Sequence, residues 1–429
     1  NSQTFFSMPH KNIWHPFTIQ KNMPEPLRVV RGEGIWLELD DGRRIIDAVS
    51  SWWVNLHGHS NPVIAKAIYE QAQKLEQVMF AGFTHQPAEE LAELLADKLP
   101  GDLTKVFFSD NGSTATEVAM KAALQYWQNK GDKRQTFICF EEAYHGDTFG
   151  AMSGSARSVW SDMFEDWMFD VEFIPFPETW IGDEKVGEKE DKIIDQIEQL
   201  LDRNPHKYAG IIIEPLIQGA GGMRMCRSEF LQKLHWVNRQ FNTLLIFDEV
   251  MTGFGRTGSW FASERAQVEP DIICLSKGIS GGFLPISVTV FSDEIYEEFV
   301  TDEPLKTFWH GHSYTANPLG CAASIASIRL LEENTMFKEM ETIHLSKKEE
   351  VMNHPDIDKF RVTGTVAAFT IKSEDGDSYL SPIADRIKRE CADQQVLIRP
   401  LGNTVYLMPP YVITPDELDY LWNQTLSLV

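Results

Sequence analysis

Two charged residues in the middle of the chain stand where chemistry could take place. Asp248 ends the apolar run LLIFDE, and Lys277 follows the apolar run DIICLS and precedes a glycine-rich turn. If both runs are parallel strands, both side chains emerge at the carboxyl edge of the sheet, where α/β proteins bind ligands. Charged residues at strand ends are more often solvated surface groups. Burial, however, would lower the pKa of Lys277 and leave its amine free to attack a carbonyl.

A third segment could bind a phosphate. The residues Ser109–Ser113 follow the run KVFFSD and open a long helical pattern, in which we expect Thr114 and Glu117 to form a capping box. Free amides and the dipole at a helix N-terminus bind phosphate, although this segment alone could equally be an ordinary helix cap. A phosphate cup, a lysine and a strand-end aspartate together describe a site for pyridoxal phosphate. The aspartate would keep the ring nitrogen protonated, which makes the ring an electron sink.

Short apolar runs that alternate with amphipathic stretches must position these residues. Runs that are apolar at successive positions suit strands covered on both faces. Their alternation with helices predicts an α/β fold with a mostly parallel sheet and helices on both faces. We expect helices over 113–130, 192–202, 228–240, 384–394 and 415–426, and a solvated loop over 182–192. The expected strands are 105–110, 136–140, 171–176, 209–215, 244–249, 271–276 and 286–292.

The two ends of the chain differ from this central region. The first 55 residues are turn-rich and extended in pattern, and helical patterns flank short strands after residue 330. We therefore predict a large domain over residues 56–330 and a smaller one built from residues 1–55 and 331–429. Repeats and low-complexity tracts are not evident.

Composition limits the class of protein. The 429 residues include 39 basic and 63 acidic side chains, for a net charge of −24, and 43% are hydrophobic. Such a chain can bury a large core, and its charge disfavours nucleic acids and anionic membranes as partners. No apolar run approaches the roughly 18 residues of a membrane span, and the first residues do not resemble a secretory signal. The five cysteines form no CxxC pair, which predicts reduced, buried thiols in a cytoplasmic protein.

Several motif matches point to other chemistry and fail on context. The GxGxxG match Gly253–Gly258 does not directly follow its strand, and this separation disfavours a dinucleotide site. The GxSxG match Gly278–Gly282 precedes a segment that cannot readily begin a helix, which disfavours a serine hydrolase. There is no phosphate-binding GxxxxGK[ST] loop for an NTPase. The two HxH pairs lack a third ligand at a recognisable spacing, so we expect structural roles and no metal for His57, His59, His310 and His312.

The remaining motifs resemble a known family. The residues Phe247–Val250, the GFGRTG run and Ser276–Gly278, in this order, resemble the class III aminotransferases, which are fold-type I pyridoxal-phosphate enzymes. Further segments from about residue 12 onward resemble the branch that aminates 8-amino-7-oxononanoate in biotin biosynthesis. The resemblance implies a seven-stranded, mostly parallel sheet in the large domain and a smaller α+β domain. The matching segments are Trp14–Thr18, Ser50–Trp53, Val78–Phe80, Ala143–Thr148, Gln218–Arg224, His310–Tyr314, Ile398–Pro400 and Met408–Tyr411.

The resemblance implies roles for the cofactor site. Lys277 would form the imine with the cofactor aldehyde, and Asp248 would pair with the ring nitrogen. Tyr144 would stack on the ring and shape the substrate pocket, completing the catalytic set. Gly112 and Ser113 would bind the cofactor phosphate.

The resemblance also implies a shared site in a homodimer. His312 and Ser313 would reach the phosphate of the neighbouring subunit, and Gly311 would lie beside its substrate. Arg399 would grip the carboxylate of the keto substrate, a task that suits its planar fork.

Aromatic residues would line the substrate pocket. Trp52 and Trp53 suit the cationic groups of S-adenosylmethionine, although paired tryptophans are otherwise often core residues. Phe17 stands where some relatives have a tyrosine, so the hydroxyl contact that those relatives make with the substrate is absent here.

The implied reaction is a ping-pong transamination with small-molecule substrates. The amino donor would be S-adenosylmethionine, but His310–Tyr314 resembles the branch that uses lysine. Ornithine, 4-aminobutyrate or a diamine would be the substrate if the chain is another class III enzyme. A noncatalytic scaffold and a nicotinamide-dependent dehydrogenase are the remaining alternatives.

Overall fold

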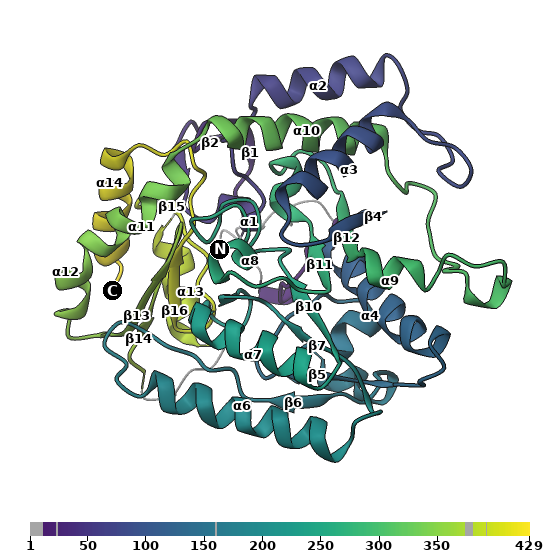
Figure 1. The fold of residues 1–429 in the computed structure, drawn as a ribbon. Helices are drawn as coiled ribbons and strands as arrows, with labels where there is room; N and C mark the ends of the chain where they lie inside the picture. Colours follow the sequence, from purple (N-terminus) through teal and green to yellow (C-terminus); the bar gives the residue numbers. More distant parts are fainter. Residues whose placement is uncertain (1–11, 23–24, 159–160, 374–380, 392) are drawn as a thin grey trace.

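A seven-stranded sheet lies at the centre of the fold (Figure 1). The computed structural model describes residues 12–22, 25–158, 161–373, 381–391 and 393–429. The strand order is β4-β12-β11-β10-β7-β5-β6, and β12 is antiparallel to both of its neighbours. Every predicted strand is present, so the mostly parallel α/β sheet is confirmed. The strands are Leu103–Ser109 (β4), Thr136–Phe140 (β5), Glu172–Ile174 (β6), Tyr208–Ile213 (β7), Leu244–Asp248 (β10), Ile272–Leu275 (β11) and Ser287–Ser292 (β12).

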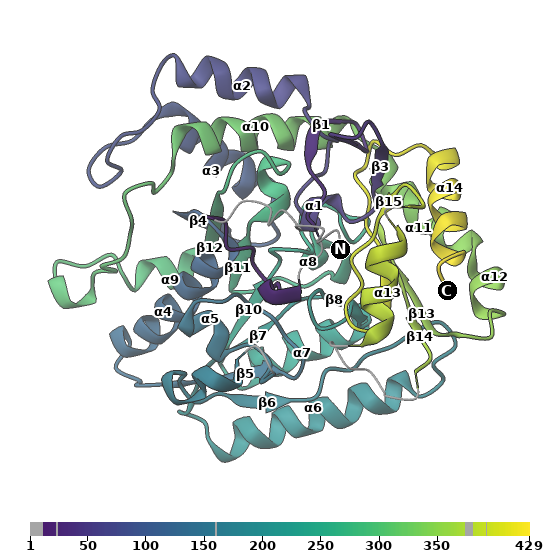
Figure 2. The same ribbon diagram turned by 180° about the vertical axis from the view of Figure 1, so that it is seen from behind.

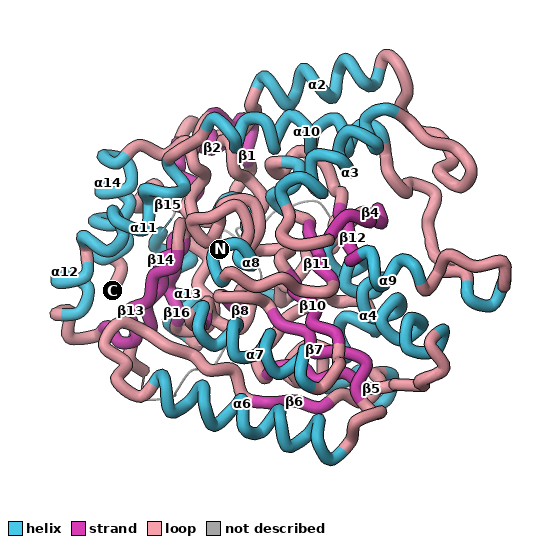
Figure 3. Tube along the Cα trace, in the orientation of Figure 1, coloured by secondary structure: helices cyan, strands magenta, loops and turns pink. Residues whose placement is uncertain are grey.

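The central strands are apolar on both faces because helices cover both faces (Figure 3). In β10, Leu245 and Phe247 enter one core cluster while Leu244 and Ile246 enter the other. This alternation is the side-chain period of a strand, which places successive residues on opposite faces. Helix α4 packs on one face and α7 on the other. The longer helices of this region are Pro62–Ala72 (α2), Gln86–Lys98 (α3), Gly112–Asn129 (α4), Val186–Arg203 (α6), Ser228–Gln240 (α7) and Pro318–Glu333 (α10).

Short elements connect these helices and strands. They lie within the connecting segments around the sheet, and several of them are single turns of helix. They are Ser50–Trp53 (α1), Phe149–Ser153 (α5), Asp162–Trp167 (η2), Ile217–Gln218 (β8), Arg224–Met225 (β9), Ala262–Ala266 (α8), Lys277–Ser280 (η3), Asp293–Glu297 (α9) and Pro304–Lys306 (η4).

The predicted loop over 182–192 is wrong from residue 186 onward. Helix α6 begins at Val186, within the charged run. Glu190 is fully buried and accepts hydrogen bonds of 2.8 and 2.7 Å from Arg227, while Lys233 lies 3.4 Å from it. The charges therefore serve an ion-paired helix start, and the apolar residues that follow continue the same buried face. The other predicted helices are present within three residues of their expected bounds.

Both ends of the chain contribute to a second sheet region (Figure 2). One sheet has the order β1-β2-β3-β15, in which β15 pairs in parallel with β3. A second sheet has the order β13-β14-β16. The predicted domain limits at 55/56 and 330/331 stay a prediction. These elements are Gln20–Asn22 (η1), Val29–Glu33 (β1), Trp36–Leu39 (β2), Arg44–Asp47 (β3), Met336–Ser346 (α11), Lys348–Met352 (α12), Ile357–Thr363 (β13), Val366–Ile371 (β14), Pro382–Cys391 (α13), Val396–Leu397 (β15), Thr404–Leu407 (β16) and Pro415–Leu426 (α14).

Two expectations from composition concern the interior and the membrane. The predicted burial of the thiols is confirmed, because all five cysteines are buried. Within the described ranges, none of the helices combines the length and the apolar character needed to cross a bilayer.

Candidate active site

A cavity of about 470 Å³ lies at the carboxyl edge of the central sheet. Strands β10 and β11 are parallel neighbours, and they deliver Asp248 and Lys277 to this edge. The sequence interpretation of these two strand ends therefore describes the observed arrangement. The cavity is lined by Trp53, Asn111, Gly112, Ser113, Tyr144, His145, Gly146, Asp147, Thr148, Glu214, Asp248, Val250, Met251 and Lys277.

Lys277 is the amine of this cavity. It follows β11 after one intervening residue, Ser276, and its Nζ atom lies 4.3 Å from the centre of the Trp53 ring. Burial lowers the pKa of Lys277 to about 8, even though the negative charges of Asp248 and Glu214 act in the opposite direction. A larger fraction of the amine is therefore unprotonated near neutral pH than in an exposed lysine, as a nucleophile or a proton acceptor requires.

Asp248 is held in place by a buried histidine. Its Oδ2 atom lies 2.7 Å from Nδ1 of His145, and its Oδ1 atom accepts the N–H of Val250 at 3.1 Å. Burial alone would lower the pKa of His145, but the hydrogen bond and charge of Asp248 outweigh it and raise that pKa. The other ring nitrogen of His145, Nε2, is buried and has no partner among the described residues. These contacts fix the position of the Asp248 carboxyl group at the cavity wall.

The N-terminus of α4 forms another wall. Asn111 caps the helix, because its Oδ1 accepts the N–H of Thr114 at 3.0 Å and the Thr114 hydroxyl accepts the N–H of Asn111 at 3.3 Å. The predicted capping box of Thr114 with Glu117 is therefore wrong, since Thr114 occupies the third position of the helix. Glu117 instead accepts hydrogen bonds from the Thr148 hydroxyl and, at 3.0 Å, from the N–H of Ala151.

Two glycines at this helix end leave room for neighbouring side chains to approach the backbone closely. A Cβ atom on Gly112 would lie 2.6 Å from Cγ1 of Val250, and one on Gly146 would lie 2.1 Å from Oγ of Ser113. The Ser113 hydroxyl lies 2.7 Å from that of Thr148. Backbone N–H groups, hydroxyls and a helix dipole in one place are a chemistry that binds phosphate. The cavity's residues thus fit a phosphorylated ring compound with an aldehyde.

Glu214 is a buried carboxyl group that the sequence interpretation did not single out. Its two oxygens accept the N–H of Tyr144 and the N–H of Gly219, both at 2.9 Å. Burial raises the pKa of Glu214 to about 7. Glu214 follows β7 directly and Asp248 is the last residue of β10, so a charged residue at the end of an apolar strand was a usable signal.

Tyr144, whose N–H donates to Glu214, also lines the cavity. Burial and the nearby Asp147 raise the pKa of its phenol, which therefore stays protonated. Its sequence position follows β5, another strand that ends at the carboxyl edge.

A second group of predicted residues lies outside the set that lines the cavity. The Arg399 guanidinium carbon lies 4.5 Å from the centre of the Trp52 ring, and the Phe17 ring meets Trp52 edge-on at 5.5 Å. Trp52 and Phe17 remain partly exposed. Of the predicted tryptophan pair, Trp53 therefore belongs to the Lys277 cavity and Trp52 to Arg399.

Comparison with known proteins identifies the family. The sequence profile described as aminotransferase class-III matches residues 18–427. The chain belongs to the class III aminotransferases. An adenosylmethionine-8-amino-7-oxononanoate aminotransferase from Synechococcus elongatus is 53% identical over 421 residues, which cover 98% of this chain and 99% of the relative. A relative of the same name from Geobacter sulfurreducens is 35% identical and covers 98% of this chain and 96% of its own length.

Solved structures of an aminotransferase and an amine transaminase have the same fold. An adenosylmethionine-8-amino-7-oxononanoate aminotransferase from Methanocaldococcus jannaschii superposes with a TM-score of 0.89 at 32% identity, covering 97% of this chain and 96% of its own. A PLP-bound amine transaminase from an uncultivated Pseudomonas species has a TM-score of 0.91 at 27% identity, covering 98% and 99%. The predicted family, its biotin-pathway branch, the fold and the pyridoxal-phosphate-dependent aminotransferase class are confirmed.

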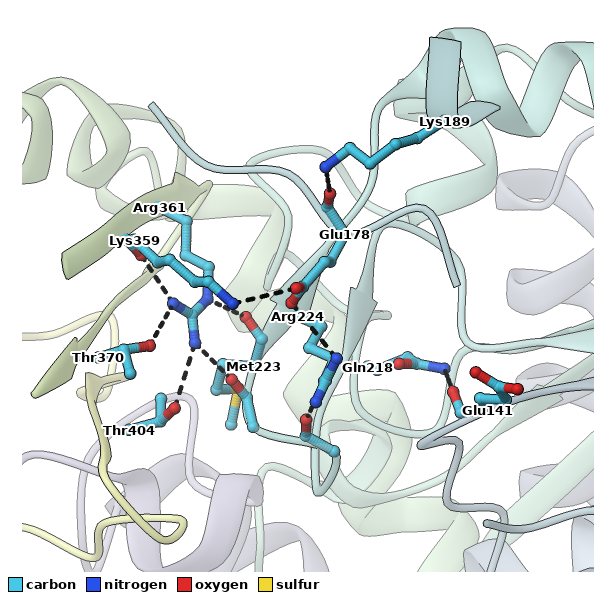
Figure 4. Close-up of polar contacts among 12 residues, drawn as sticks. Glu141, Glu178, Lys189, Gln218, Met223, Arg224, Lys359, Arg361, Thr370 and Thr404 are labelled. Atoms are coloured by element: carbon cyan, nitrogen blue, oxygen red, sulfur yellow. Dashed lines mark hydrogen bonds and ion pairs between the residues drawn. The ribbon is translucent and has the colours of Figure 1, made fainter. Parts of the chain in front are cut away.

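The glycine-rich segment Gln218–Arg224 contacts both the aminotransferase site and the C-terminal sheet, and Figure 4 shows its contacts with Arg361 of that sheet. Arg361 of β13 donates to the carbonyl oxygens of Gly222 at 2.6 Å and Met223 at 2.7 Å. A Cβ atom on Gly219 would lie 3.1 Å from the Trp53 ring, so the segment packs directly against that tryptophan. The C-terminal part of the chain thereby supports one wall of the cavity.

Gly311, His312 and Ser313 lie apart from the cavity of their own chain. They belong to the loop between α9 and α10, and none of the three lines the cavity. The Ser313 carbonyl accepts a hydrogen bond from Gln77 at 2.6 Å. The loop carries large exposed side chains, among them Trp309.

The histidines of the HxH pairs contact different groups. His57 lies 3.0 Å from Oγ of Ser327, and His59 lies 2.9 Å from Oδ2 of Asp47. His310 lies 2.8 Å from Lys121. Over the described ranges, no group of three or more His, Cys, Asp or Glu residues could hold a metal ion.

Proposed function

We propose that this enzyme transfers an amino group from S-adenosylmethionine to 8-amino-7-oxononanoate, which yields 7,8-diaminononanoate in biotin biosynthesis. The observation that carries the proposal is Lys277, which shares one cavity with Asp248 and the N-terminus of α4. The acceptor and donor follow the name of the relative from Synechococcus elongatus, which is 53% identical. The cofactor is pyridoxal 5′-phosphate.

The cavity residues have distinct tasks toward this cofactor. Gly112 and Ser113 would hold the phosphate at the start of α4, and Asp248 would hold the ring nitrogen. Tyr144 would cover a face of the ring. When bound, pyridoxal phosphate withdraws electrons from the carbon that carries the transferred amine, and this acidifies its proton.

Lys277 would move that proton. Its pKa of about 8 lets the amine accept a proton near neutral pH and return it within the same pocket. The Trp53 ring centre lies 4.3 Å from Nζ, so the ring packs against the amine. Asp248 would keep its orientation because His145 and the N–H of Val250 hold its carboxyl group.

Arg399 and Trp52 would bind the substrates beyond the cavity. The guanidinium fork suits the carboxylate of the keto acid, so Arg399 would act mainly in the second half-reaction. Phe17 and Trp52 offer aromatic surface to a long alkyl chain and to the sulfonium donor.

Half-reaction kinetics test the donor. The enzyme loaded with pyridoxal phosphate is mixed separately with S-adenosylmethionine, lysine and ornithine, and conversion of the cofactor to its amine form is followed by absorbance. Conversion by S-adenosylmethionine, followed by turnover of 8-amino-7-oxononanoate, is the expected result. Conversion by lysine alone would replace the donor, because the His310–Tyr314 segment resembles lysine-using relatives. Conversion by ornithine without turnover of the keto acid would assign another class III reaction.

We further propose a cytoplasmic homodimer with composite sites. The exposed Trp309 and the position of His312 and Ser313 outside their own cavity support a role for this loop toward a second subunit. Lys277→Ala subunits mixed with subunits carrying both His312→Ala and Ser313→Ala should regain about a quarter of wild-type activity, since one hybrid site has every native residue. No gain on mixing, with hybrid dimers verified by mass, would contradict shared sites. The buried thiols support a reducing compartment.

A further inference from the structure

The two tryptophans of the substrate region stand on a left-handed turn. The φ angles are 50° at Ser50, 50° at Ser51, 84° at Trp52 and 74° at Trp53. The left-handed region is unfavourable for residues with a Cβ atom, and it is usually visited by single residues. A run of four such residues persists only where the surroundings determine it, and such strain concentrates at functional sites.

Asp47 provides much of the support that holds this turn in its left-handed conformation. Its Oδ1 atom accepts the backbone N–H of Ser51 at 2.9 Å and that of Val49 at 3.2 Å. Its Oδ2 atom accepts the Ser51 hydroxyl at 2.7 Å. The carboxylate is fully buried, and all of these contacts are with the segment that forms the turn.

His59 completes the shell around this carboxylate. Its Nε2 atom lies 2.9 Å from Oδ2 of Asp47, and its Nδ1 atom lies 3.2 Å from the amide nitrogen of Asn55. The Asn55 amide donates to Nδ1, so Nε2 carries the hydrogen atom and donates a hydrogen bond to Oδ2 of Asp47. Gly32 makes room for this ring, because a Cβ atom there would lie 2.6 Å from Cβ of His59.

The same aspartate adjoins the strand that leads to Arg399. In the parallel pair of β3 with β15, Asp47 stands opposite Leu397, and the N–H of Ala48 donates to the Leu397 carbonyl at 3.2 Å. Arg399 follows two residues later. One residue thus connects the turn that carries Trp52 with the strand end that carries Arg399.

We propose that Asp47 and His59 are positioning residues that set the Trp52–Arg399 pair and thereby the binding of the acceptor carboxylate. The role rests on the proposed function in one respect only, the identity of the acceptor. Neither residue lines the cavity, so both act through the turn. Trp53, on the same turn, is also held by hydrogen bonds from its indole to Tyr406 and from Arg256 to its carbonyl. The Lys277 side of the site therefore depends less on Asp47.

The test uses a series of variants that weaken the contacts around Asp47 to increasing degrees. His59→Gln keeps an N–H donor toward Asp47, while His59→Ala removes it, and Ser51→Ala removes one hydroxyl from the carboxylate. Asp47→Asn is the most severe change. Glu190→Gln is the matched control, because Glu190 is also a fully buried, hydrogen-bonded carboxylate but lies in α6, away from the site.

Two readouts separate positioning from general damage. The first is binding of octanoate to the enzyme loaded with pyridoxal phosphate, followed by tryptophan fluorescence. The second is a comparison of KM for 8-amino-7-oxononanoate with the rate of the donor half-reaction. We expect His59→Ala and Asp47→Asn to weaken octanoate binding and raise this KM at least tenfold. The donor half-reaction should change less than threefold, His59→Gln should restore most of the affinity, and Glu190→Gln should change neither quantity.

Other results would overturn the role. Unchanged octanoate affinity in folded His59→Ala and Ser51→Ala would do so, and these variants decide the matter if Asp47→Asn fails to fold. Equal losses in the donor and acceptor reactions, with no rescue by His59→Gln, would indicate a merely structural residue. Failure of the wild type to aminate 8-amino-7-oxononanoate would refute the proposed acceptor. Octanoate binding would still test the positioning roles of Asp47 and His59.

Discussion

Oδ2 of Asp248 lies 2.7 Å from Nδ1 of His145, and both side chains are buried at the end of the cavity that holds Lys277. The histidine supplies the donor that a buried carboxylate needs, because an unpaired charge would be costly there. Together with the N–H of Val250, which donates to Oδ1 at 3.1 Å, the histidine fixes the orientation of the Asp248 carboxyl group.

Asp248→Asn should therefore lower kcat by about a hundredfold or more, since a fixed charge aimed at the reacting group is lost. Steady-state kinetics at saturating cofactor measures this loss. His145→Gln is the companion variant, because its amide can still donate to Asp248, and it should retain more activity. Equal activity of Asp248→Asn and the wild type would contradict the assigned role.

Lys277→Ala should abolish transamination while the fold remains, and it should remove the cofactor absorbance that borohydride abolishes in the wild type. The pKa of Lys277, about 8, adds a pH dependence. Only the unprotonated amine attacks a carbonyl, so the rate at which the apoenzyme reacts with pyridoxal phosphate should rise as pH increases through 8. Stopped-flow absorbance between pH 6.5 and 9.5 measures this rate, and Lys66→Ala, a change of an exposed lysine, should leave it unchanged.

Arg399→Ala should raise KM for the keto acid by about 10- to 100-fold, which is the worth of a charge-assisted hydrogen bond. The donor half-reaction should change much less. Arg399→Lys should recover only part of the affinity, because an ammonium group cannot bind a carboxylate through a fork. Equal effects on the two half-reactions would show that the assignment to the acceptor is wrong.

Glu214→Gln should lower the free energy of unfolding by about 1–3 kcal/mol, because an amide can replace only one of the two acceptor oxygens. Either the N–H of Tyr144 or that of Gly219 would lose its partner. Urea denaturation measures the change. Glu33→Gln, which affects an exposed ion pair with Arg31, should stay within about 0.5 kcal/mol of the wild type.

His344 should make the protein less stable in mild acid. Burial lowers the pKa of His344 to about 4, so the unfolded chain takes up a proton near pH 6.5 while the folded chain stays neutral. Stability is therefore complete above pH 6.5 and falls as pH decreases toward 4, by about 2 kcal/mol at pH 5 for this residue. Urea denaturation at pH 7.5 and pH 5 measures the loss. The loss should be smaller in His344→Gln than in the wild type, and an equal loss would contradict the shift.

Much of the central fold was predictable because its strands are apolar on both faces. That pattern located β10 and β11, and the strand ends then located Asp248 and Lys277. The start of α6 was missed because a buried Glu190 with two cationic partners looks, in one dimension, like a solvated charge run.

The site was predictable to a lesser degree. Glu214 carries the same strand-end signal as Asp248, but its role depends on two backbone N–H groups that no residue type reveals. The cap of α4 by Asn111 was missed because Thr114 fits two capping patterns, and only the geometry distinguishes them. The turn at Ser50–Trp53 was hidden for a related reason, since left-handed backbone is ordinarily signalled by glycine.

The parallel pair of β3 with β15 also bears on how the enzyme is made. Residues 46 and 47 emerge from the ribosome well before their partners at 396 and 397, which are translated 350 residues later. Trp52 is consequently translated long before Arg399, and a nascent chain that halts before residue 399 lacks a complete substrate pocket. Chaperone demand and sensitivity to premature stop codons should thus depend on β15 more than on the large central sheet.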